Sequence, residues 1–174
     1  LETFGPIIGE GREGGTPWHP EHITERFSAL AIITLGEGVV GTVASVHAAE
    51  SGVAWTWEPV LLIITGLLLV FGMWWIYFSI PWGQLIALRP KRRFAFSYGH
   101  ILVFGSIAAT GASLQIAGNT LERSSAHVSP TLAVIVLASA VGIYVVTLFT
   151  LHSVVTNTHD RFHLALPAAT ILVI

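Results

Sequence analysis

Cysteine is missing from this 174-residue chain, and charged residues are scarce. Without cysteine there is no disulfide bond, no thiolate zinc site, no iron–sulfur cluster and no cysteine nucleophile. Asp, Glu, Lys and Arg make up 10% of the residues, against roughly 25% in soluble domains. Eight basic and ten acidic residues give a net charge of −2, which excludes a polybasic nucleic-acid binder. Asp160 is the only aspartate, so a catalytic pair of aspartates is excluded as well.

Hydrophobic residues, in contrast, make up 53% of the chain, and the mean hydropathy is +0.73. They come in blocks of about twenty residues, the length that a helix needs to cross a hydrocarbon core of ~30 Å. The apolar content also excludes a disordered chain. The sequence therefore predicts an all-α fold, a polytopic transmembrane helix bundle.

The blocks predict four complete spans and the start of a fifth. We expect a loop over 1–21 and a transmembrane helical domain over 22–174. The first helix is expected to be capped by His22 or Thr24. The expected helices are 22–49, 59–80 with Pro59 at its first position, 96–118, 131–152 and an unfinished one from 164, with a short amphipathic segment at 81–88. Because residue 1 is not Met and the last apolar run breaks off, we expect a fragment of a longer chain with further helices.

The positive charges predict the orientation in the membrane. Arg89, Lys91, Arg92 and Arg93 lie in one loop, and alternation of the spans places every Lys and Arg except Arg123 on the same side. Loops rich in Lys and Arg stay in the cytoplasm. We therefore predict a multi-pass protein of the bacterial inner membrane with residues 89–93 in the cytoplasm.

Glu37 is an ionisable residue within the first predicted span. It lies about 17 Å along the helix from Arg26, eleven residues away, and the two share a face. A carboxyl group at this depth is costly and normally faces a partner or a wet cavity. Glu37 is therefore either a proton, ion or ligand site in a polar core, or a protonated or hydrogen-bonded side chain that locks helix packing.

Small residues surround Glu37 and recur in the third predicted helix. Gly36, Gly38 and Gly41 flank the carboxylate, and the run 105–112 contains a similar set. Small residues let two helices approach closely in lipid. We therefore expect the first and third spans to be neighbours, with Gln115 as a hydrogen-bond partner for another helix.

A second group of polar residues lies at the predicted cytoplasmic side. Histidines at one depth can hold a haem iron, or zinc together with a carboxylate, and histidine is also common at membrane interfaces. No metal-binding spacing such as HExxH is present, so no cofactor is predicted, and haem or metal held by His100 and His152 is kept as an alternative. The group consists of His22, Glu25, Arg26, Tyr98, His100, His152, His159, Asp160 and His163.

Motifs of soluble enzymes are missing. The chain has neither a glycine-rich phosphate loop followed by Lys-Ser or Lys-Thr nor a Gly-x-Ser-x-Gly elbow. These absences favour a protein that is not an enzyme, and no catalytic residue is predicted.

Three separated motifs resemble those of a known family. They are His22-x-x-Glu-Arg-Phe followed by Leu35-Gly-Glu37, then Trp74-Trp-x-Tyr-Phe78, then Tyr98-Gly-His100. In this order they are similar to the bacterial low-temperature-requirement A (LtrA) membrane proteins, over about residues 19–151. The sequence departs from that pattern at Gly38, where the family often has Ser. The resemblance implies a polytopic inner-membrane protein linked to growth in the cold, a stress response, and it implies no reaction.

Three functional hypotheses follow. The leading one is a transporter-like or sensory module with Glu37 and Arg26 at its polar core. The second is a membrane redox or metal protein that uses His100 and His152, and the third is a structural scaffold. The expected partners are the lipid bilayer, the helices of a longer chain and, as an option, a second copy. A repeated acid-Arg-Phe triplet at 25–27 and 160–162 raises the hypothesis of an internal repeat.

Overall fold

The computed structural model describes residues 19–50, 57–120 and 128–157, without the side chains of 44–50 and 58. Within these ranges the chain is helical and has no strand. The helices are α2 (Pro20–Glu50), α3 (Trp57–Phe78), α4 (Trp82–Leu88), α5 (Arg93–Asn119) and α6 (Pro130–Thr156), with a short 3-10 turn, η2 (Pro90–Arg92), before α5.

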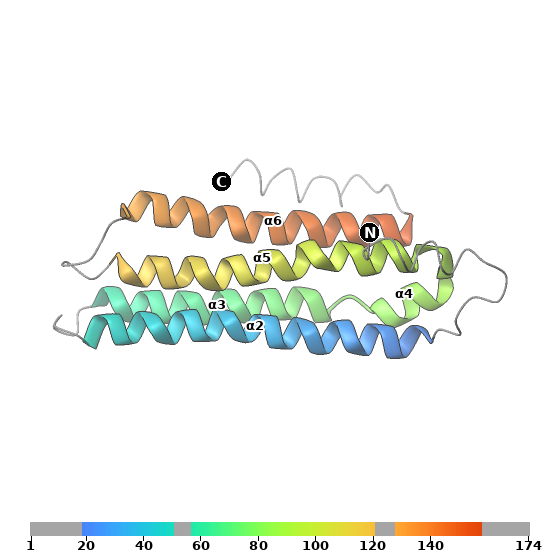
Figure 1. Cartoon of the computed structure of the whole chain (residues 1–174), viewed down its shortest axis with the longest axis horizontal. Coiled ribbons are helices and arrows are strands. Elements are labelled where there is room, and N and C mark those ends of the chain that lie inside the picture. The colour runs from blue at the N-terminus through green and yellow to red at the C-terminus, as the bar shows by residue number, and fades with distance from the viewer. Residues whose placement is uncertain (1–18, 51–56, 121–127, 158–174) are drawn as a thin grey trace, which may run out of the picture.

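The four long helices lie side by side along the long axis of the molecule (Figure 1). α5 packs along both α2 and α6, and α2 also packs against α3 and α4. α2 and α5 run in one direction, whereas α3 and α6 run in the other (Figure 1). The short helix α4 lies where α2 and α5 begin and α3 and α6 end. We call this end of the bundle the α4 end.

The outer surface of the bundle is apolar. Four helical segments, 20–43, 59–88, 90–119 and 130–156, are long and apolar enough to cross a membrane. Large hydrophobic side chains point outward from them, such as Ile33 at 70% exposure and Leu68 at 67%. A soluble monomer rarely exposes so continuous an apolar surface. The predicted all-α transmembrane bundle with four spans is thus confirmed, whereas the expected fifth helix and the second triplet at 160–162 lie outside the described residues.

Three predicted helix starts are wrong by two or three residues: those of α2 and α3, and that of α5, which begins at Arg93 rather than at residue 96. α2 begins at Pro20, before His22 and Thr24, because proline has the backbone angle of a first helical residue and lacks an N–H that would go unused there. Thr24 does not cap this helix. Its hydroxyl donates to the carbonyls of Pro20 and Glu21, at 3.0 Å each. α3 begins at Trp57 rather than at Pro59. The first backbone N–H groups of a helix have no partner within the helix, so a proline, which lacks an N–H, is tolerated throughout the first turn.

The fourth predicted helix is longer at its C-terminal end. α6 continues past His152 to Thr156 and ends at Asn157, which has the left-handed backbone angle φ of 53°. Asparagine is one of the few residues that adopt this conformation readily at a helix end. At the other end, the Ser129 side chain accepts a hydrogen bond from the Leu132 backbone N–H at 3.3 Å.

α2 and α5 cross at glycines, as the small residues predicted. A Cβ atom on Gly111 of α5 would lie 2.9 Å from the Glu37 carbonyl carbon of α2, and one on Gly41 would collide with the Gly111 carbonyl oxygen. α2 also approaches α3 closely, because a Cβ on Gly38 would lie 2.5 Å from the Val70 side chain. The prediction that the first and third spans are neighbours is confirmed.

Candidate functional site

His100 of α5 is fully buried at the α4 end, inside a cluster of aromatic rings. The Phe96 ring lies 4.2 Å from the histidine ring and the Phe27 ring 4.8 Å, measured between centroids. Tyr77 of α3 and Trp82 of α4 each meet the His100 ring edge to face at 5.7 Å. Four helices therefore enclose one polar ring at membrane depth.

Both nitrogens of the His100 ring are at hydrogen-bond distance from protein oxygens. Nδ1 lies 2.7 Å from the Phe96 carbonyl oxygen, and Nε2 lies 2.9 Å from the Tyr77 hydroxyl. A carbonyl oxygen only accepts, so Nδ1 carries the hydrogen and the neutral ring accepts at Nε2 from the Tyr77 O–H. The Ser28 side chain of α2 lies beside the same tyrosine and lines a cleft with it. Ser28, Tyr77 and His100 thus form a chain of neighbouring polar side chains across α2, α3 and α5, in which Tyr77 and His100 are hydrogen-bonded.

The Ser28 end of this chain opens into a cleft. The cleft has a volume of about 380 Å³ and lies between α2, the end of α3 and α4. Its polar lining comes from Thr24, Glu25 and Ser28, whereas Tyr77 and Trp82 form part of its wall. The Trp82 indole N–H is buried and has no hydrogen-bond acceptor among the described residues. The arrangement can hold a small polar group and relay a change of protonation at His100 to it.

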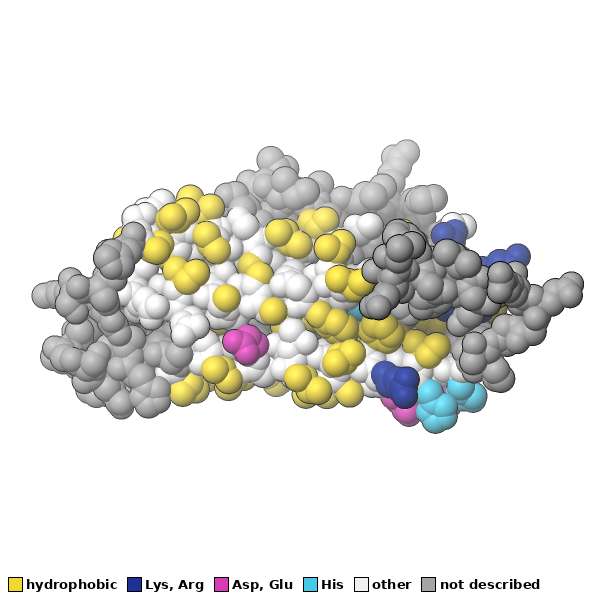
Figure 2. Space-filling model, in the orientation of Figure 1, with side chains coloured by type: hydrophobic (Ala, Val, Ile, Leu, Met, Phe, Trp, Pro, Cys, Tyr) yellow, Lys and Arg dark blue, Asp and Glu magenta, His cyan; other side chains and the backbone are white. Residues whose placement is uncertain are grey.

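The other predicted residues of the α4 end lie nearer the surface. Glu25 is exposed, and its carboxylate is 3.4 Å from Nδ1 of His22. Arg26 is exposed as well, beside Glu25 in the chain. Tyr98 is half-buried and stacks on Phe94 with centroids 6.4 Å apart. Charged and histidine side chains gather at this end in Figure 2, while patches of hydrophobic side chains and one acidic side chain lie along the middle of the face.

Glu37 lies far from this site, on the surface of the described bundle. Its backbone and Cγ pack against Gly111, and Gln115 follows one turn later on α5, also exposed. The structure therefore brings Glu37 and Gln115 to the same α2–α5 seam. Arg26 and Glu37 do not meet in a common buried core within the described residues, so the polar core stays a prediction.

His152 of α6 contacts Trp82, as His100 does. Its ring centroid is 6.4 Å from that of Trp82, which in turn contacts the His100 ring. Within the described ranges, no three His, Cys, Asp or Glu side chains gather in a way that could hold a metal ion. A metal on His100 would have to displace one of the two hydrogen bonds of the ring.

Three residues of the site were not predicted as site residues from the sequence, although Tyr77 lies within the motif at 74–78. Tyr77 and Trp82 are aromatic residues near the ends of apolar segments, where such residues are common for reasons of packing. Ser28 is one small hydroxyl in a long apolar helix. The available signal was the i, i+4 spacing of Thr24 and Ser28, which places two hydroxyls and the neighbouring Glu25 near one face of α2.

A comparison with models of known protein families gives a match over the chain. The family model described as bacterial low temperature requirement A protein (LtrA) matches residues 1–174. No curated protein matches the chain, and no solved structure does.

Proposed function

The chain belongs to the bacterial low temperature requirement A (LtrA) family, and from this premise we propose that it is a transporter-like or sensory protein of the bacterial inner membrane that supports growth in the cold. It binds a small polar group in the cleft at the α4 end, which faces the cytoplasm. The observation that carries the proposal is the buried Tyr77–His100 hydrogen bond beside a cleft that Ser28 and Tyr77 line. Ionisable residues inside a membrane are costly and mark functional pathways.

The Tyr77–His100 hydrogen bond can reverse its direction. While His100 is neutral, Tyr77 donates to Nε2. When Nε2 takes up a proton, the ring becomes a donor, and Tyr77 must turn its hydrogen toward Ser28 and the cleft. Among the described aromatic rings that contact His100, Tyr77 is the titratable one, and the others are Phe27, Phe96, Phe104 and Trp82. Ligand binding in the cleft is thereby coupled to protonation of His100.

Glu37 and Gln115 form a second polar position in this proposal. Both side chains are exposed on the described bundle, in segments long and apolar enough to cross a membrane. An unpaired carboxylate there costs ~3 kcal/mol or more, so a partner outside the described residues is required. Helices of a longer chain or a second copy supply that partner.

A pair of matched tyrosine variants tests the proposed function. Tyr77 and Tyr144 are both fully buried, and the Tyr144 hydroxyl donates to the Met73 carbonyl oxygen at 2.7 Å, away from the cleft. Each Tyr→Phe change removes one buried hydroxyl and one hydrogen bond. In a strain that depends on the full-length protein, we expect Tyr77→Phe to lose growth at low temperature and Tyr144→Phe to retain it. Growth is compared at a permissive temperature, and membrane protein levels are measured by immunoblot.

Equal cold growth of the two variants at equal protein levels would refute the proposal. Equal loss of both would show that the hydroxyls only stabilise the bundle.

A further inference from the structure

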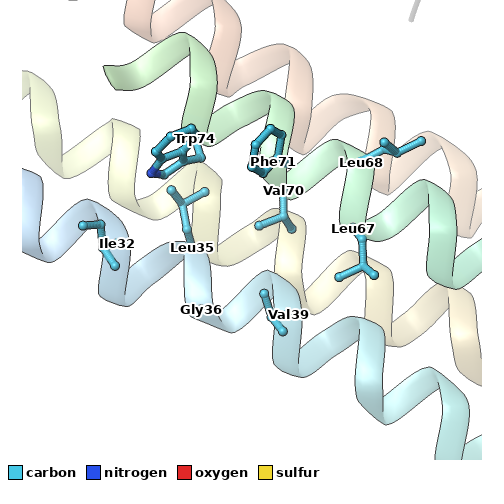
Figure 3. Close-up of a pocket in the computed structure, with 9 residues that line it drawn as sticks. All are labelled: Ile32, Leu35, Gly36, Val39, Leu67, Leu68, Val70, Phe71 and Trp74. Atoms are coloured by element: carbon cyan, nitrogen blue, oxygen red, sulfur yellow. The ribbon is translucent and has the colours of Figure 1, made fainter. Parts of the chain in front are cut away.

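A groove runs along the seam between α2 and α3, on the outside of the bundle. Its volume is about 620 Å³. Hydrophobic side chains and one glycine line it, among them Ile32, Gly36 and Val39 of α2 and Leu67, Phe71 and Trp74 of α3 (Figure 3). Phe71 is 60% exposed and Ile32 55% exposed, so the lining is open to whatever surrounds the bundle. In a membrane, that surrounding is the acyl region of lipids.

Gly36 keeps part of the groove open. A Cβ atom built on it would meet nothing within 4 Å, whereas Gly38 and Gly41 of the same helix are tightly packed against other helices. Gly36 is therefore not needed for helix contact. Its missing side chain leaves a trough between Ile32 and Val39.

The groove continues into the polar cleft at the α4 end. Ile32 lines both cavities. Along α2, the residues Glu25, Ala29, Ile32, Gly36 and Val39 follow the three- and four-residue spacing that keeps side chains on one face. From Glu25 to Val39 this face is about 21 Å long, which exceeds the ~15 Å depth of one leaflet of the hydrocarbon core. The seam is thus polar at its interfacial end and apolar along the rest.

The polar end offers a negative charge. The Glu25 side chain is 74% exposed, with His22 as its partner at 3.4 Å. The Trp82 ring forms part of the cleft wall, and its indole N–H is buried. A carboxylate complements an ammonium group.

We propose that the α2–α3 seam binds a phospholipid with an amine headgroup from the leaflet at the α4 end. An acyl chain lies in the groove over Gly36, and the ammonium group pairs with Glu25. This inference rests on the proposed function, because it names the class of ligand that enters the same cleft. The phospholipid is the occupant because its amphipathic shape and headgroup charge match both ends of the seam.

Native mass spectrometry of the full-length protein tests the proposal. The protein is equilibrated in detergent with equimolar phosphatidylethanolamine and phosphatidylglycerol, and retained lipids are identified after release. We expect wild type to retain phosphatidylethanolamine in preference to phosphatidylglycerol. Gly36→Phe fills the groove and is expected to lower this occupancy about tenfold, because the acyl chain loses its apolar contact surface.

Two further variants serve as controls. Gly105 of α5 also has open space around its Cβ position but does not line the groove, so Gly105→Phe should bind as wild type does. Glu25→Gln keeps the shape of the side chain and removes its charge. This variant should therefore retain phosphatidylethanolamine and phosphatidylglycerol in a ratio of about one. Unchanged binding by Gly36→Phe, a wild-type preference for phosphatidylglycerol, or a second copy of the chain cross-linked across Gly36 in place of lipid would overturn the proposal.

The two proposals fail in distinguishable ways. If wild type retains no amine lipid while Tyr77→Phe still loses cold growth, the lipid inference fails and the proposed function stands. If the lipid is retained and displaced by Gly36→Phe while Tyr77→Phe grows normally in the cold, the proposed function fails instead.

Discussion

The glycine crossing of α2 and α5 gives a matched prediction about stability. Gly111 and Gly105 lie on the same helix, six residues apart. A Cβ atom on Gly111 would lie 2.9 Å from both the carbonyl carbon and oxygen of Glu37, whereas one on Gly105 would meet nothing within 4 Å. Gly111→Ala therefore introduces a clash between the new Cβ atom and the backbone of α2, whereas Gly105→Ala introduces no clash.

The magnitude follows from three separate effects. Carbon atoms pack best at about 3.5–4.0 Å, so a Cβ on Gly111 is too close by more than half an ångström. Overpacking of this kind costs ~1–3 kcal/mol. Replacing glycine with alanine inside a helix gains up to ~1 kcal/mol in propensity, and both variants share this gain. The difference between the two variants is therefore about 1–3 kcal/mol, with Gly111→Ala the less stable.

Unfolding of the full-length protein by sodium dodecyl sulfate in mixed micelles provides the assay. Helical circular dichroism reports the free energy of unfolding for wild type and both variants. We expect Gly105→Ala to match or exceed wild type and Gly111→Ala to fall below Gly105→Ala by the amount above. Equal stabilities of the two alanine variants would refute the close α2–α5 crossing.

Three more outcomes are expected. In intact cells, a cysteine that replaces Arg92 should not react with a membrane-impermeant thiol reagent, whereas one that replaces Asn119, at the opposite end of α5, should react. The reverse pattern would overturn the predicted orientation in the membrane. Glu37→Gln should accumulate normally in the membrane yet lose cold growth of the full-length protein, whereas normal growth of Glu37→Gln together with degradation of Glu37→Ala would indicate a packing role. Purified full-length protein should show no Soret band, because both nitrogens of His100 are hydrogen-bonded; a band that His100→Leu abolishes would contradict this.

Much of the fold can be predicted from the sequence because lipid imposes simple rules. The apolar blocks identify the four long helices, and the amphipathic stretch at 81–88 matches α4, whose buried residues are Trp82 and Ile86. The glycines around Glu37 identify α2 and α5 as neighbours, since only small residues permit so close a crossing. The helix ends are predicted less accurately, because a capping residue and a proline such as Pro20 can each indicate the start of a helix, at different positions.

The candidate site depends on contacts between helices that spacing along one helix does not contain. The sequence singles out His100, but its surroundings come from Phe27, Tyr77 and Trp82 on three other helices. The position of Trp82 depends on how α4 folds back against α2 and α6 after Pro81. Glu37 attracts attention in the sequence because it is charged, yet the described bundle leaves it on the surface.

The central claim is that the Tyr77–His100 pair serves function rather than stability, and a double variant separates the two. Tyr77→Phe alone leaves Nε2 of His100 without a donor, at a cost of ~1–3 kcal/mol. Tyr77→Phe combined with His100→Leu removes both polar partners, and such paired replacement is nearly neutral for stability. The decisive measurement is low-temperature growth of cells whose membranes contain the double variant at the wild-type level. We predict no growth in the cold; growth equal to wild type would contradict the account.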